Sequence, residues 1–103
     1  SKILFIQLVR YFKKIAKEKK HIPYLIVFPQ KLDIINSKTN KNYINFFKNQ
    51  ISKEINTLDL TVFFNEKNSS KLFINQYYGG HLNSKGNKFV ANIINKFLKK
   101  FNV

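Results

Sequence analysis

The chain has 103 residues, a formal net charge of +14 and no cysteine, so its length suits one domain rather than two. Without cysteine it has no disulfide framework, thiolate metal site or cysteine nucleophile, and two histidines with five acidic residues argue against a metal cage. Its apolar runs fall short of the roughly 20 residues that cross a bilayer, and its N-terminus does not read as a signal peptide. We expect no metal, cofactor or membrane span; the compartment stays unknown, with the cytoplasm as default.

The positive charge comes almost entirely from lysine, which supplies 18 of the 19 basic residues. Lysine, asparagine, isoleucine and phenylalanine all have A/T-rich codons, so codon bias explains the composition under any function. Proteins that read nucleic acid favour arginine for base contacts, and Arg10 is the single arginine. Nucleic acid is therefore the less favoured partner, although a charge of this size attracts polyanions.

The N-terminal half predicts one helix and one strand. Residues 2–19 carry apolar side chains at helical spacing, with lysines on the opposite side. Residues 24–28 form a continuous apolar run that ends at Pro29, which is typical of a strand covered on both faces. Proline stops this strand because it has no N–H to donate to a neighbour.

The second half predicts a strand between two helices. Residues 30–41 are polar and turn-like, residues 43–56 form a helix, and residues 58–64 form a strand with alternate apolar side chains on one face. A loop follows over residues 65–80, and the last helix covers about residues 84–101. Strand, helix and strand within about 40 residues predict a right-handed βαβ unit with parallel strands.

The element order α-β-α-β-α predicts a three-layer α/β/α fold around a parallel sheet. Two parallel strands make a poor independent sheet, because both outer edges stay unpaired. Residues 1–103 are therefore either a single domain or the C-terminal fragment of a larger, doubly wound domain. If they fold alone, we expect an oligomer or a marginally stable monomer.

The glycines of the chain and two candidate helix-capping residues lie close to His81 in the sequence. The three glycines of the chain are Gly79, Gly80 and Gly86. Glycine permits backbone angles and close approaches that a Cβ forbids, and Asn83 or Ser84 can cap the helix that follows. Either these residues hold His81 before a helix N-terminus, where active-site loops of α/β proteins collect, or they form a simple turn with an exposed histidine.

The string Gly80-His81-Leu82-Asn83-x-x-Gly86-Asn87-x-x-x-Ala91-x-x-Ile94 resembles the C-terminal block of the SGNH (GDSL-like) hydrolase superfamily. The family has a histidine before its last helix, then Leu or Pro, Asn, and a glycine five residues after the histidine. The strand that ends at Pro29, the helix and the second strand also match the family's order of elements. The resemblance covers most of the chain but only the C-terminal part of a flavodoxin-like SGNH domain.

The resemblance implies that this chain supplies the catalytic histidine of a serine esterase or acylhydrolase. His81 would be the general base for a serine hydroxyl, with Gly79, Gly80 and Asn83 positioning its loop. The implied substrate of the parent protein is a small ester, such as an acylated lipid or sugar.

Two departures from the family pattern limit this implication. Tyr78 and Gly79 stand where the family usually has an aspartate that orients the histidine. The Gly-Asp-Ser nucleophile motif and the glycine and asparagine of the oxyanion hole are also absent, so the chain alone should be inactive. Two alternatives stay open, a lysine-rich module that binds nucleic acid or another polyanion, and a noncatalytic interaction domain.

Overall fold

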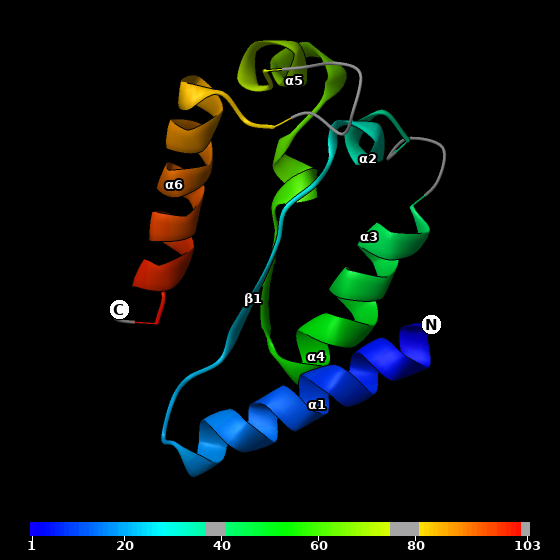
Figure 1. Ribbon diagram of the computed structural model, residues 1–103, viewed down its shortest axis with the longest axis vertical. Coiled ribbons are helices and arrows are strands. Elements are labelled where there is room, and N and C mark those ends of the chain that lie inside the picture. The colour runs from blue at the N-terminus through cyan, green and yellow to red at the C-terminus, as the bar shows by residue number, and fades with distance from the viewer. Residues whose placement is uncertain (37–40, 75–80, 102–103) are drawn as a thin grey trace.

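The structure is a computed structural model that describes residues 1–36, 41–74 and 81–101 (Figure 1). Its helices and strands follow one another in this order: α1 (Lys2–Glu18), β1 (Tyr24–Val27), α2 (Lys31–Asn36), α3 (Asn42–Phe46), the π-helix η1 (Phe47–Ile51), α4 (Ser52–Glu54), β2 (Asn56–Asp59), the 3₁₀ helix η2 (Leu60–Phe63), α5 (Glu66–Leu72) and α6 (Ser84–Lys99).

The two long helices predicted from the sequence are confirmed at both ends of the chain. The Ser1 side chain caps α1 by accepting from the N–H of Leu4 at 3.2 Å. The helix stops where Lys20 takes a positive φ of 58°, three residues before Pro23. In α6 the buried side includes Val90, and Ile93, Ile94 and Phe97 pack against the same core.

The predicted parallel strand pair is present, but its second strand is shorter and earlier than expected. β1 pairs with β2 in parallel, with Ile26 opposite Leu58. β2 ends at Asp59, because the Oδ1 of this residue accepts from the N–H of Thr61 at 3.0 Å and starts η2. Val62 consequently leaves the inner face that strict alternation predicts and is 59% exposed.

Two short helices replace segments that the sequence predicts as turn and loop. In α2, the carboxylate of Asp33 accepts from the N–H of Gln30 at 2.8 Å, and Ile34 is only 2% exposed. In α5, Asn65 and Asn68 form a reciprocal capping box. With six and seven residues, both helices are too short to display a helical apolar period, so hydrogen bonds at their N-terminal ends favour them locally.

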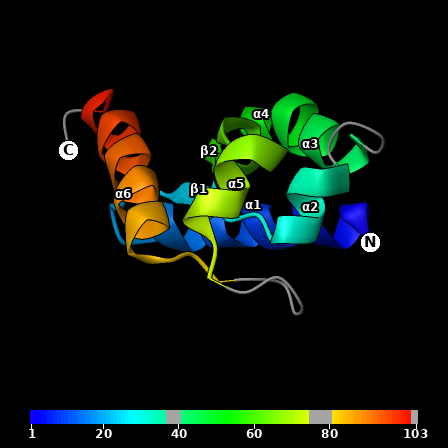
Figure 2. The same ribbon diagram turned by 90° about the horizontal axis from the view of Figure 1, so that it is seen from above.

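The core consists of two apolar clusters on opposite faces of the strand pair. Ile26 of β1 packs with the first cluster, which contains Ile34, Leu58, Leu60, Phe64, Phe73 and Val90. Leu25 packs with the second, which contains Val9, Phe46, Ile51 and Ile55. Figure 2 shows α6 on one side of the strands and α3 and α4 on the other. Successive strand residues point to opposite faces, so β1 joins the two clusters.

The predicted three-layer α/β/α fold is wrong. The described chain is mostly helical, and its sheet has only two parallel strands. Three local events explain the difference. Asp59 ends β2 early, the predicted helix over residues 43–56 is interrupted by the π-helix η1, and the polar segments at residues 30–41 and 65–80 contain α2 and α5.

Candidate functional site

The backbone around His81 is fixed against the end of α5. Phe73 and Leu82 form an antiparallel bridge. On one side of it, the N–H of Ile74 donates to the His81 carbonyl oxygen at 2.7 Å, and on the other the N–H of Asn83 donates to the Leu72 carbonyl oxygen at 2.8 Å. The His81 carbonyl and the two residues that follow it are thus held against the end of α5.

Asn83 joins the end of α5 to the start of α6. Its Oδ1 accepts from the N–H of Gly86 at 2.8 Å and caps α6. Its Nδ2 donates to the Lys71 carbonyl oxygen at 2.8 Å, which satisfies one of the free carbonyls at the end of α5. The side chain of Asn83 therefore connects the end of α5 to the first turn of α6.

Gly86 is required by a close approach between α6 and α5. A Cβ at this position would lie 2.3 Å from the Leu72 carbonyl oxygen and 2.9 Å from Leu82 Cδ2. Any larger residue would force the start of α6 away from the α5 end and would pull on Asn83 and His81. The spacing of histidine and glycine in the sequence thus has a packing reason in the structure.

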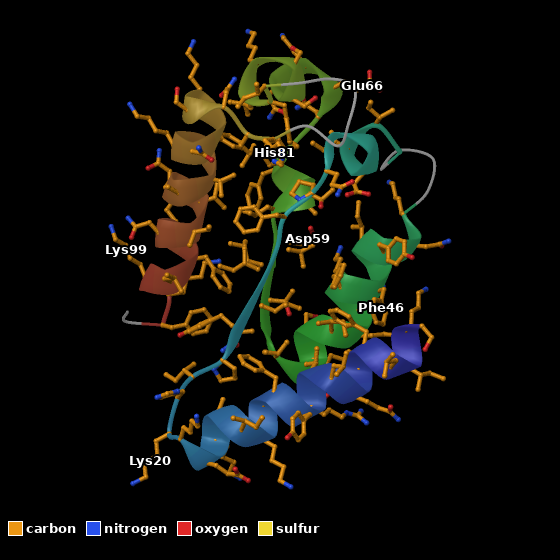
Figure 3. The ribbon with its side chains drawn as sticks, in the orientation of Figure 1. Lys20, Phe46, Asp59, Glu66, His81 and Lys99 are labelled. Atoms are coloured by element: carbon orange, nitrogen blue, oxygen red, sulfur yellow. The ribbon has the colours of Figure 1, made fainter. Side chains whose placement is uncertain are left out.

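The His81 side chain is exposed and makes no hydrogen bond to the residues that the structure describes. Figure 3 places it toward the end of the molecule where α2 and α5 lie, the end to which the carboxyl ends of β1 and β2 point. Ligands of α/β proteins commonly bind beyond the carboxyl ends of parallel strands. The other two loop residues of the prediction, Gly79 and Gly80, lie outside the described residues.

Two of the five acidic side chains, Asp33 and Asp59, line a pocket of about 270 Å³ near the carboxyl ends of the strands, together with aromatic side chains such as Tyr43 and Phe47. His81 is not among the described residues that line it. Each carboxylate accepts a backbone N–H from its own segment, Asp33 from Gln30 and Asp59 from Thr61. Within the described residues, no carboxylate orients the imidazole of His81.

The serines of the described segments have local structural partners or lie in exposed positions. Ser1 caps α1, and the hydroxyls of Ser69 and Ser70 donate to backbone carbonyls within α5. The hydroxyl of Ser52 donates to the Lys48 carbonyl of the preceding π-helix η1. Ser84 is exposed in the first turn of α6. None of these hydroxyls pairs with His81 in the described structure.

Basic side chains lie on α1, α5 and α6, and several of those on α1 line one groove. That groove, of about 610 Å³, is lined by Arg10, Lys13, Lys14, Lys17, Lys20, His21, Ile22 and Pro23. Arg10 is engaged there, because its guanidinium donates to Glu54 at 2.7 Å. The hydrogen bond from Arg10 lowers the pKa of the Glu54 carboxyl, and the same bond raises the pKa of Arg10.

No family model matches the chain, and neither the curated proteins nor the solved structures give a match. The described residues contain no group of three or more metal-ligating side chains. They also contain no helix long and apolar enough to cross a membrane.

Proposed function

We propose that this chain supplies the general-base histidine of an SGNH-like serine esterase or acylhydrolase. The observation that carries the proposal is the combination at residues 81–86. An exposed imidazole sits on a residue whose carbonyl oxygen is bonded to the N–H of Ile74. It lies shortly before a helix that is capped by Asn83 and packed closely at Gly86. A fixed backbone with a free imidazole suits a residue that must meet a substrate group in one geometry.

The chemistry assigned to His81 is acyl transfer. One imidazole nitrogen takes the proton of a serine hydroxyl as its oxygen bonds to the ester carbonyl carbon, and the imidazolium then gives that proton to the departing alcohol. Water repeats the sequence and releases the acid. The serine, the oxyanion-hole donors and the group that orients His81 are contributed by polypeptide outside these 103 residues. The substrate is a small ester, such as an acylated lipid or sugar.

The test is ester hydrolysis by the complete protein to which this chain belongs, with p-nitrophenyl acetate as substrate. His81→Ala should lower kcat/KM at least about a hundredfold, the range of general-base contributions. His21→Ala is the matched control, because His21 is also exposed and directly follows Lys20, which lies at the opposite end of the molecule from His81 (Figure 3). Unchanged hydrolysis by His81→Ala would sink the assignment and favour a noncatalytic interaction domain.

Binding of a polyanion along α1 is the second candidate, and the lysine-lined groove is the observation that favours it. Replacing Lys14 and Lys17 by glutamine should then weaken retention on heparin more than replacing Lys96 and Lys99 of α6. Equal losses from the two pairs would mean that retention reflects net charge alone.

A further inference from the structure

The pocket of about 270 Å³ at the carboxyl ends of the strands is built from several separate parts of the chain. Its walls come from the end of β1, the first turn of α2, one face of α3 and η1, and the turn from β2 into η2. Figure 1 and Figure 2 both show α2 and α3 on the same side of the strands, opposite α6. The pocket is therefore a product of tertiary packing and not of one loop.

Aromatic side chains form much of the pocket wall. Tyr43 and Phe47 are four residues apart, so they lie on one face of the continuous helix that α3 and η1 form. Phe28 lines the same pocket directly after β1. Phe28 and Tyr43 are 56% and 69% exposed, and neither ring contacts another ring among the described residues. Both rings can therefore meet a ligand.

Two carboxylates share the pocket, and each is held through one of its oxygens. Oδ2 of Asp33 accepts from the N–H of Gln30, and Oδ1 of Asp59 accepts from the N–H of Thr61. These bonds orient the carboxylates, and they leave the second oxygen of each without a hydrogen bond to any residue that the structure describes. Each carboxylate thus keeps one oxygen for a ligand.

The pocket is negative in a chain that is strongly positive. Two of the five acidic residues line it, whereas none of the 19 basic residues is found among the lining residues that the structure describes. The ion pairs within the described segments both involve Glu54, so neither Asp33 nor Asp59 has a basic partner there. Two carboxylates near one cavity repel each other, and a bound cation would offset that repulsion.

We propose that this pocket binds a small organic ammonium ion. The ammonium N–H groups donate to the two carboxylates, which form charge-assisted hydrogen bonds. The aromatic rings contact the cation and its carbon substituents, as in other sites that recognise ammonium groups. This binding site is independent of the catalytic proposal, because His81 is not among the described residues that line the pocket.

Other ligands fit the pocket less well. An anion would be repelled by both carboxylates. Calcium takes six to eight oxygen ligands and magnesium a full octahedron, but the described residues contain no group of three or more metal-ligating side chains. A neutral ligand would cover the carboxylates without compensating their charge. An ammonium ion matches both the charge and the aromatic wall.

The first test measures binding of benzylamine, which is protonated at pH 7, to the complete protein by calorimetry at low ionic strength. We expect Asp33→Asn and Asp59→Asn each to weaken binding at least about tenfold, because each removes a charged acceptor. Asparagine keeps an oxygen for the backbone N–H, so both variants should keep the fold. Glu18→Gln removes the same charge at an exposed position of α1 and should leave the affinity unchanged.

Two results of this titration would overturn the proposal. One is no binding of benzylamine by the wild type. The other is an equal loss of affinity in Glu18→Gln, which would mean that only net charge attracts the amine. Benzyl alcohol has the same shape without the charge and should bind at least tenfold more weakly. Equal binding of the two compounds would reduce the site to an apolar cavity and would also contradict the proposal.

The second test examines the aromatic wall. Tyr43→Leu should weaken benzylamine binding at least threefold, because it removes a ring that the cation contacts. Tyr11→Leu is the matched control, since Tyr11 is 63% exposed on α1 and does not line the pocket. Equal affinities of the two variants would contradict the aromatic contact and the proposed site.

Further measurements identify the source of the cation. His81→Ala should bind benzylamine like the wild type, so the ammonium site and the catalytic proposal can fail separately. Displacement of benzylamine by an equal concentration of Mg²⁺ or Ca²⁺ would assign the pocket to a metal and overturn the proposal. Sedimentation should show the same oligomeric state with and without benzylamine. Dissociation of an oligomer by the amine would assign the pocket to a lysine of a second copy and would also overturn it.

Discussion

Gly86 and Asn83 determine how the backbone near His81 is held, and each acts through a specific contact. Gly86 leaves room for the Leu72 carbonyl oxygen, and Asn83 connects the ends of α5 and α6 through two hydrogen bonds. The sequence predicted the helix cap at Asn83 or Ser84, and it predicted close packing at Gly86. It could not predict the bonds to Lys71 and Leu72, because α5 has no apolar period that would reveal it.

Gly86→Ala should destabilise the protein by about 1–3 kcal/mol, as overpacking does. In an exposed helix interior, glycine to alanine would raise the free energy of unfolding by roughly 0.5–1 kcal/mol. At Gly86 we expect this free energy to fall instead. Thermal or urea unfolding measures this change in stability, and Asn92→Ala at an exposed site of the same helix is the control. A gain in stability for Gly86→Ala would show that α6 can shift without cost.

Asn83→Ala should cost about 1–2 kcal/mol of unfolding free energy, because it removes the cap of α6 and the bond to Lys71. Asn83→Ser keeps a capping hydroxyl but is too short to replace the amide donor, so it should lose less. Urea unfolding of both variants separates the two contributions. Equal losses would mean that the cap contributes nothing.

At the scale of elements, the sequence predicted the two long helices and the parallel pairing of the strands, because their apolar patterns are long and regular. It missed α2, α5 and the end of β2, where short polar side chains bond to nearby backbone and override the weak pattern. Asp59 is the clearest example. Its carboxylate accepts from Thr61, and a strand that alternation extends to Phe64 stops five residues earlier.

The ion pair between Arg10 of α1 and Glu54 of α4 should make the thermal stability of the protein depend on pH. Arg10 holds the pKa of Glu54 below its ordinary value of 4.5, chiefly by its hydrogen bond. Because the pKa of Glu54 is lower in the folded protein than in the unfolded chain, the ion pair stabilises the protein at pH values above the unfolded pKa. This stabilisation is lost as the pH falls through the pKa of the folded protein. The Tm of wild type should therefore exceed that of Glu54→Gln at pH 7, and the difference should vanish well below pH 4.5.

The same difference in Tm should shrink in high salt, because the pair is accessible to solvent. Glu18→Gln, at an exposed position of α1, is the control and should show no comparable difference. A difference between wild type and Glu54→Gln that persists at pH 2 would contradict the ion-pair account.

At the scale of the whole molecule, the chain is less compact than its length allows. The radius of gyration is 14.9 Å, compared with about 13 Å for a compact domain of 100 residues. Two separate core clusters on a two-stranded pair account for this extension. The sequence pointed to the weakness of a two-stranded sheet, but it could not show which edge or helix face would stay uncovered.

Because β1 and β2 connect the two clusters, the molecule should unfold in one transition. Leu60 and Ile51 are both fully buried, one in each cluster. Leu60→Ala and Ile51→Ala should each lower the unfolding free energy by about 2–5 kcal/mol and shift a single calorimetric transition. If one variant separates a second transition from the first, the clusters fold independently.

The most direct measurement of the central claim is labelling with a fluorophosphonate, which reacts covalently with an activated serine. The complete protein should be labelled, and His81→Ala should lose the label while His21→Ala keeps it, because only the histidine that activates the serine controls its reactivity. Labelling of His81→Ala at the wild-type rate, or no labelling of the wild type at all, would contradict the assignment of His81 as the general base.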